Sequence, residues 1–197
     1  MDQSQNSTKT RCAWVGDDPL YIEYHDTEWG VPAHDDKTQF EFLTLESAQA
    51  GLSWLTILKR REGYRQVFHN FDVQKVSLVT EDEIQSALLD PGIIRNKLKV
   101  RAAVKNAQVF LEIKKEFGTF SKYIWGFVGG TQLQNNWGNI SEVPTTSKES
   151  DELSRDLKRR GMTFVGSTII YAHMQATGLV NDHTFDCFRH TECIALP

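Results

Sequence analysis

The feature that most constrains the fold is a repeated succession of helix-starting and helix-ending residues around segments with helical apolar spacing. A helix from about residue 37 to Ala50 is interrupted by Gly51, and Ser53 is placed to cap the next helix. A further apolar helix over about 167–177 stops at Gly178. Alternating, strand-like patterns are nearly absent. The sequence therefore predicts an all-α protein.

Two capping boxes mark further helix starts. Thr80 pairs with Glu83, and Thr146 pairs with Glu149. Residues 90–92 (DPG) end the first of these helices, and a longer helix is expected over about 95–117. The second extends to about residue 161, where a glycine is suited to a left-handed stop.

The length of 197 residues allows one compact domain or two small lobes. With 40% apolar and 24% charged residues, the chain has the composition of a globular protein. Its apolar stretches are far shorter than the roughly 20 residues that span a bilayer, and the polar residues 1–10 predict a disordered tail rather than a signal peptide. We expect a cytoplasmic protein without a membrane partner. The net charge of −4, taken alone, argues against nucleic-acid binding.

The few cysteines and the histidines suggest a metal site. Three cysteines are an odd count, which disfavours a disulfide framework and fits a reducing cytoplasm. His183 and Cys187 are four residues apart, so a short helix capped by Asn181 or Asp182 would point both to one side. Zinc in a structural site takes four such ligands.

The other two ligands must come from elsewhere in the chain, and Cys12 with His25 is the natural pair. Such a site would join the N-terminal segment to the C-terminal one and leave no position open for a substrate. A buried thiol with surface histidines fits the spacing equally well. His190 and Cys193 are rival ligands that spacing does not exclude.

Aromatic residues crowd toward the start of the chain, where they form either ordinary core or the walls of a pocket for a flat ligand. These residues are Trp14, Tyr21, Tyr24, Trp29 and Trp54. Glu46 lies among apolar neighbours, and a buried carboxylate beside aromatic rings suits a planar cation. The pattern alone favours the alternative in which Glu46 faces solvent.

Residues 89–97 (LDPGIIRNK) place a glycine-containing turn directly before a helix, which is a favourable site for a phosphate. The helix that follows is basic, and no acidic residue occurs over 93–111. Its cations are Arg95, Lys97, Lys99, Arg101 and Lys105. Such a run is often only a solvated face, but its position beside the turn favours nucleic acid, since local charge decides a local interface.

Five segments together resemble bacterial 3-methyladenine DNA glycosylase I, a family of the helix-hairpin-helix DNA glycosylases. They are RCAW (11–14), DPLY (18–21), YHDTEWG (24–30), LESAQAGLSW (45–54) and GLVNDH (178–183). The resemblance extends from Cys12 to about Cys187. It implies a two-lobed all-α fold with a zinc snap that joins the terminal segments: a zinc-containing lobe of residues 11–36 and 118–197, and a helix-hairpin-helix lobe of residues 37–117.

The resemblance also implies roles for individual residues. One structural zinc ion per chain would be held by Cys12, His25, His183 and Cys187. Glu46 and Tyr24 would be catalytic and Trp54 would stack on the base, with Trp14, Tyr21 and Trp29 nearby. Gly92, Arg95 and Lys97 of the hairpin would contact DNA, and Gly51 with Leu52 would fill the gap left in the duplex. No Asp occurs between Asp90 and Asp151, which argues against the Asp-led mechanism of many relatives.

The implied activity is a step of base excision repair. A monomeric enzyme would flip 3-methyladenine out of alkylated double-stranded DNA and hydrolyse its N-glycosidic bond. The product would be an abasic site without strand cleavage. Two alternatives are a zinc-stabilised protein that binds damage without excision, which needs no base pocket, and a zinc hydrolase, which needs an open metal position.

Overall fold

The computed structural model describes residues 9–196, and helices dominate it. The α-helices are α1 (Pro19–Thr27), α2 (Asp36–Gln49), α3 (Trp54–Leu58), α4 (Arg61–Val67), α5 (Val73–Ser77), α6 (Glu81–Ala87), α7 (Lys97–Phe117), α8 (Phe120–Trp125), α9 (Lys148–Arg159), α10 (Ser167–Ala176) and α11 (Phe188–Ile194). Short 3-10 helices are η2 (His69–Phe71), η3 (Gly126–Val128) and η4 (Ile140–Glu142). The predicted all-α class is confirmed except for one small sheet.

That sheet consists of two strands of two residues each, β1 (Leu133–Gln134) and β2 (Val180–Asn181). The strands are parallel, with Leu133 opposite Val180 and Gln134 opposite Asn181. Strands this short carry no alternating pattern in the sequence, which is why none was expected.

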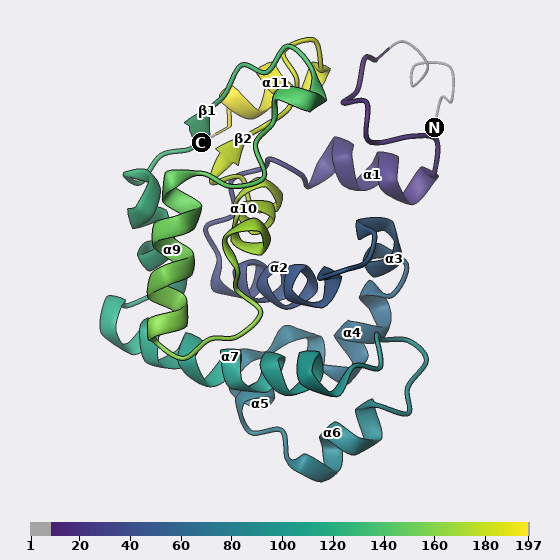
Figure 1. Cartoon of the computed structure of the whole chain (residues 1–197), viewed down its shortest axis with the longest axis vertical. Helices are drawn as coiled ribbons and strands as arrows, with labels where there is room; N and C mark the ends of the chain where they lie inside the picture. The colour runs from purple at the N-terminus through teal and green to yellow at the C-terminus, as the bar shows by residue number, and fades with distance from the viewer. Residues whose placement is uncertain (1–8, 197) are drawn as a thin grey trace.

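Helix α2 is the central element, and Figure 1 shows it between α10 and α7. Every residue over 39–48 is buried, because α3, α7, α8 and α10 all pack against this helix. Phe40 on α2 contacts Phe110 on α7 edge-on at 5.4 Å between ring centroids, and Phe110 stacks on Phe120 at 4.0 Å. Full burial of rings of this size is worth roughly 1.5–3 kcal/mol each.

Several of the other helices lie toward the two ends of the longest axis. Figure 1 shows α4–α7 at one end, and α1, α11 and the small sheet at the other. Within the first group, α7 packs on α5 and α6; near the second, α9 packs on α10. No helix over residues 9–196 is long and apolar enough to cross a membrane.

Most predicted helix starts are confirmed. Ser53 caps α3 by accepting from the Thr56 N–H, and Thr80 forms the expected capping box with Glu83. Helix α7 begins two residues later than predicted, because the Asn96 side chain accepts the N–H groups of Leu98 and Lys99 and so forms the cap.

The capping box predicted at Thr146 is wrong by one residue. Ser147 caps α9, and its partner is Ser150 rather than Glu149. Ser150 is fully buried and also bonds to Ser167 at 2.8 Å, so packing against α10 sets where α9 begins. A glutamate in that buried position would need a partner for its charge.

The short helix predicted to hold His183 and Cys187 is also wrong. Asn181 belongs to β2, and pairing with β1 holds it extended, which prevents a helix from starting there. The chain instead makes a turn in which the Cys187 N–H donates to the Thr184 carbonyl at 2.8 Å, and α11 begins after Cys187.

Of the predicted tail 1–10, residues 1–8 lie outside the described part of the chain. Lys9 and Thr10 are exposed, and the Phe188 N–H donates to the Thr10 carbonyl at 3.0 Å.

Candidate functional site

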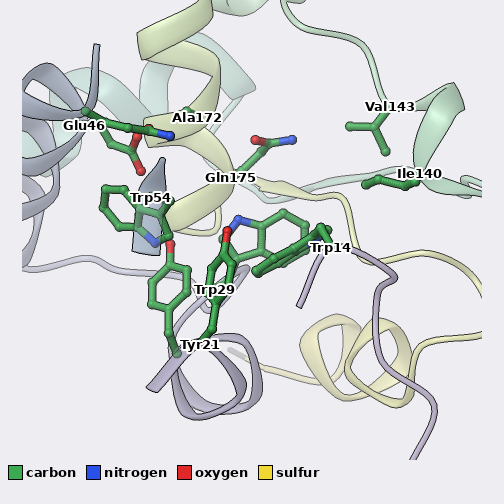
Figure 2. A pocket seen from close by; sticks show the side chains of 11 residues that line it. Trp14, Tyr21, Trp29, Glu46, Trp54, Ile140, Val143, Ala172 and Gln175 are labelled. Atoms are coloured by element: carbon green, nitrogen blue, oxygen red, sulfur yellow. The ribbon is translucent and has the colours of Figure 1, made fainter. Parts of the chain in front are cut away.

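All six residues proposed for a pocket line one cavity of about 220 Å³. This volume is below the 300–1,000 Å³ typical of drug-sized ligands, so the cavity suits a small flat molecule. Figure 2 shows the aromatic rings facing the polar groups of Glu46 and Gln175. The lining residues are Trp14, Tyr21, Tyr24, Trp29, Glu46, Gln49, Trp54, Ile140, Val143, Ala172 and Gln175.

Helix α1 and its flanks supply most of the aromatic wall. Asp18 caps the helix by accepting the Leu20 N–H at 3.0 Å. Tyr21 and Tyr24 are three residues apart, so they lie on one face of α1. Trp14 lies 4.9 Å from both Tyr21 and Trp29 between ring centroids.

Trp54 forms part of the opposite wall. Its ring lies 5.5 Å from that of Tyr24, and Ser53 fixes its position at the first turn of α3. The Trp54 Nε1–H is buried and has no hydrogen-bond partner within the described chain. Tyr24 is buried as well, and desolvation raises the pKa of its hydroxyl well above the ordinary value.

Glu46 is buried, with only 4% of its surface exposed, and burial raises the pKa of its carboxyl group to about 8. The interpretation that it faces solvent is therefore wrong. The reason is the central place of α2, which leaves no solvent face over 39–48. No hydrogen bond or ion pair reaches the Glu46 side chain from the described residues. A free buried carboxyl beside aromatic rings is an acceptor for a polar or cationic ligand.

Several residues that line the cavity were not predicted from the sequence. Gln49 lies three residues after Glu46, so helical spacing could have found it. Gln175 and Ala172 come from α10, while Ile140 and Val143 come from η4 and its end. Nothing in the local sequence of these four residues indicates that the fold brings them to Glu46.

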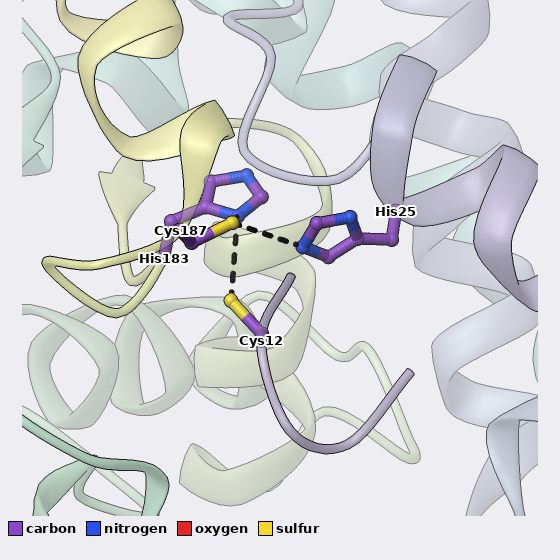
Figure 3. A group of neighbouring side chains, drawn as sticks. All are labelled: Cys12, His25, His183 and Cys187. Carbon is purple, nitrogen blue, oxygen red and sulfur yellow. Dashed lines mark hydrogen bonds between the residues drawn. The ribbon is translucent and has the colours of Figure 1, made fainter. Parts of the chain in front are cut away.

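The four proposed metal ligands, Cys12, His25, His183 and Cys187, form a second, buried cluster. Their ligand atoms all lie within 4.8 Å of one another, and Figure 3 shows them converging. Cys187 Sγ lies 3.4 Å from His25 Nε2 and 3.5 Å from His183 Nδ1. Cys12 Sγ lies 3.5 Å from His183 Nδ1. On a tetrahedral zinc ion, a sulfur ligand and a nitrogen ligand lie about 3.6 Å apart. The cluster therefore has the dimensions of a metal site.

The outer ring nitrogens of both histidines are already bonded. His25 Nδ1 lies 2.8 Å from Asp26 Oδ1, and His183 Nε2 lies 3.0 Å from the Trp29 carbonyl oxygen. Arg11 holds the Asp26 carboxylate in turn, at 2.7 Å. This arrangement leaves one nitrogen of each ring directed at the cluster, as metal-binding histidines require.

The rival ligands lie outside the cluster. His190 Nε2 bonds to the Asn135 carbonyl oxygen at 2.8 Å, and Cys193 is buried beside Gly30.

The hairpin between α6 and α7 packs closely on α4. A Cβ at Gly63 would lie 2.3 Å from the Gly92 carbonyl oxygen. The helix and the turn can therefore pack this closely only because residue 63 is a glycine. The Asp90 carboxylate accepts the Gly92 N–H at 2.7 Å, and the Tyr64 hydroxyl accepts the Ile94 N–H at 3.2 Å. The turn is thereby held in one conformation.

The basic run divides into bound and free cations. Glu81 pairs with Arg101 at 2.6 Å and with Lys97 at 3.9 Å, and Lys99 bonds to the end of α2. Arg95 is exposed, and no partner for it is found within the described chain. The pairing of Glu81 with these cations was not predicted, because Glu81 lies outside the acid-free stretch 93–111.

The loop after α2 begins at the edge of the cavity. Gln49 lines the cavity, and its carbonyl oxygen accepts the Leu52 N–H at 2.6 Å. Gly51 has a φ of +80°, which favours glycine, and Leu52 is 39% exposed.

Comparison with known proteins places these features in context. A family model for methyladenine glycosylase matches residues 14–190. DNA-3-methyladenine glycosylase 1 of Escherichia coli (strain K12) is 48% identical over 177 residues, which cover 90% of this chain and 95% of that protein.

Two solved structures are similar to this chain over most of its length. A crystal structure of 3-methyladenine DNA glycosylase I has a TM-score of 0.90 and 45% identity, covering 92% of this chain and all of the other. A variant of 3-methyladenine DNA glycosylase I in complex with 3-methyladenine has a TM-score of 0.88 and 38% identity, covering 90% and 96%.

Proposed function

Because the chain belongs to the methyladenine glycosylase family, we propose that it is a DNA repair enzyme that flips and excises 3-methyladenine from alkylated DNA. It hydrolyses the N-glycosidic bond and leaves an abasic site, as the first step of base excision repair. The observation that carries this function is the buried carboxyl of Glu46, which pairs with no residue over 9–196, in a small aromatic cavity. A relative with the same fold has been solved in complex with 3-methyladenine.

The chemistry follows from the substrate. Adenine alkylated at N3 carries positive charge within the nucleotide, so the base is already a good leaving group. Flipping costs a few kcal/mol, and less for a damaged base, which favours lesions. The enzyme must then hold the base while the oxocarbenium-like sugar forms and water attacks it. No lysine nucleophile is required, so the strand stays intact.

We assign Glu46 and Tyr24 to the base edge and Trp54 to its face. A cationic base in this cavity favours the ionised form of Glu46, so entry of the lesion opposes the burial that raises its pKa. Cation–π attraction to the rings adds about 0.5–2 kcal/mol over a neutral adenine. Trp14, Tyr21 and Trp29 complete the wall and exclude water.

DNA contact is assigned to two segments. In the hairpin, we place the turn at Gly92 against the phosphates of double-stranded DNA, with Arg95 and Lys97 beside it as cations. Gly51 and Leu52, at the edge of the cavity, fill the space that the flipped nucleotide leaves.

These assignments correspond to two lobes, 37–117 with the hairpin and 11–36 with 118–197 around the metal cluster. We propose that a monomer carries out the reaction in the cytoplasm.

One structural zinc ion per chain is proposed for the cluster of Cys12, His25, His183 and Cys187. Burial, the spacing of the four donor atoms and the bonded outer nitrogens of both histidines support this. Four protein ligands complete a tetrahedron, so the ion would stabilise the fold and take no part in hydrolysis. A zinc hydrolase is disfavoured for the same reason.

The function is tested by incubating the purified protein with methylated DNA and separating the released bases by chromatography. We expect free 3-methyladenine and abasic sites, with no strand breaks before alkali treatment. Release of no 3-methyladenine, or equal release by Glu46→Gln, would overturn the proposed activity or the role of the cavity respectively.

A further inference from the structure

A buried carboxylate outside the cavity fixes one of its polar groups. Asp182 is 1% exposed, and no lysine, arginine or histidine within the described chain forms an ion pair with it. Its two oxygens instead accept four hydrogen bonds from neutral groups. The Asn135 amide and the Trp137 indole donate to Oδ1 at 2.7 and 2.8 Å. The Tyr171 hydroxyl and the Gln175 amide donate to Oδ2, both at 2.7 Å.

Only a carboxylate satisfies all four donors, because an amide in its place would accept at one end and donate at the other. One of the donors cannot reverse its role. The Trp137 indole is always a donor, so the Oδ1 position, to which the Asn135 amide also donates, must remain an acceptor. A buried side chain that accepts hydrogen bonds from four donors fixes the orientation of each of them.

Of the four donors to Asp182, Gln175 is the one that lines the cavity. Since its Nε2 donates to Asp182, the amide cannot rotate by 180° without placing an oxygen against the carboxylate. Figure 2 shows the Gln175 oxygen on the side of Glu46 and the nitrogen on the far side. The cavity therefore presents the amide oxygen, an acceptor, beside the Glu46 carboxyl.

We propose that Asp182 is a positioning residue that locks the Gln175 amide with its oxygen toward the cavity, and so selects a methylated purine with an amino group at C6 over one with a keto oxygen. This inference rests on the proposed function and names the specificity of the same site. The C6 amino group donates to Gln175 Oε1; a keto oxygen there would face an acceptor, and both groups would remain unpaired.

The deciding variant is Asp182→Asn. Trp137 must keep its acceptor, so the new NH₂ group faces Tyr171 and Gln175. The tyrosine hydroxyl can turn to accept, and the Gln175 amide must rotate to do so, which turns its own NH₂ toward the cavity. The variant should therefore lose affinity for an amino base and gain affinity for a keto base.

The measurement is the dissociation constant of free 3-methyladenine and of 3-methylhypoxanthine, by calorimetry or tryptophan fluorescence. Wild-type protein should prefer 3-methyladenine by about tenfold or more, the effect of one buried hydrogen bond to an unpaired group. Asp182→Asn should reduce that preference by about tenfold, and Gln175→Leu should reduce it similarly by removing the acceptor. In the double variant the Asp182 change should add nothing further.

Asn135→Ala is the matched control. It removes a donor from the same carboxylate but from the other oxygen, so the preference should stay at the wild-type value. Bound zinc and the unfolding temperature are measured for every variant, because Asp182 precedes His183. A role confined to folding would lower the unfolding temperature and leave the ratio of the two dissociation constants unchanged.

Should Asp182→Asn fail to fold, Gln175→Leu and its control Asn135→Ala still test the contact. An unchanged ratio of the two dissociation constants in Gln175→Leu would overturn the proposal. Wild-type protein that binds neither base would overturn the proposed function itself. Wild-type protein that binds 3-methyladenine, with the same preference in Asp182→Asn, would overturn only this inference.

Discussion

The ammonium group of Lys99 donates a hydrogen bond to the carbonyl oxygen of Ala50, at 2.6 Å, and so joins helix α7 to the end of α2. It also donates to the Ala48 carbonyl at 2.8 Å. A cation in this position satisfies carbonyl groups that the helix leaves unpaired and complements its dipole. The contact fixes the start of the Gly51 loop relative to the hairpin.

Replacement of Lys99 by Met should lower the free energy of unfolding by about 1–2 kcal/mol, because two carbonyl groups lose their donor. The rate of base excision should fall as well, since the Gly51 loop would no longer be held. Urea unfolding and single-turnover excision measure the two effects. Lys105→Met is the control on the same helix, because no hydrogen bond to the Lys105 side chain is found in the described chain. Equal effects of both variants would refute the role of the contact.

Glu46→Gln should weaken binding of 3-methyladenine at least tenfold, because the variant loses the only carboxylate among the described residues that line the cavity. Binding titrations against the free base provide the measurement. Glu112→Gln, an exposed carboxylate on α7, serves as the control and should bind as wild type does. An unchanged affinity in Glu46→Gln would remove this residue from base recognition.

The same substitution should stabilise the protein at alkaline pH. Burial raises the pKa of Glu46 from its ordinary value of 4.5 to about 8, so the folded state holds a proton that the unfolded state releases in this window. Stability of the wild type therefore falls relative to Glu46→Gln as the pH rises from 4.5 to 8, by about 3–5 kcal/mol in total. Urea unfolding of both proteins at pH 5, 7 and 9 would show the difference. A gap that stays constant with pH contradicts the burial of an ionisable Glu46.

Removal of the proposed zinc should destabilise the whole protein. Freshly purified protein should contain one zinc ion per chain, and a chelator should lower the unfolding temperature. Cys12→Ser should lose the metal and several kcal/mol of stability, since metal binding contributes directly to folding. Cys193→Ser lies outside the cluster and should retain zinc. Retention of stoichiometric zinc by Cys12→Ser would exclude Cys12 as a ligand.

Arg95→Ala should weaken binding to undamaged and damaged duplexes by the same factor. One phosphate contact fewer should also reduce the slope of log K against log[salt] by about 0.9. Fluorescence anisotropy at several salt concentrations gives both values. Lys148→Ala on α9 removes a cation far from the hairpin in sequence and should change neither. A slope identical to that of wild type would mean that Arg95 touches no phosphate.

Local chemistry made much of the fold predictable. Ser53 and Thr80 each act through neighbours within a few residues, so their helix boundaries follow from the sequence. The start of α9 does not, because Ser150 is selected by a contact with Ser167 on another helix. The conformation of segment 183–187 was not predictable either, since pairing between β1 and β2 holds Asn181, just before this segment, extended.

The candidate site was predictable where residue type alone indicates chemistry, as for the cysteines, histidines and tryptophans. The burial of Glu46 was not, because it depends on four other helices that pack against α2. Nor was the division of the basic run, in which Glu81 neutralises Arg101 across 20 residues of sequence. Both outcomes are long-range, and periodicity in one segment carries no information about them.

The metal cluster joins residues that are 171 positions apart, Cys12 and His183. During synthesis, a nascent chain whose last segment is still inside the ribosome has released Trp14, Tyr21 and Trp29 but lacks His183 and Cys187, two of the four proposed ligands. Excision activity should therefore appear at release of the finished chain and not in shorter, stalled chains.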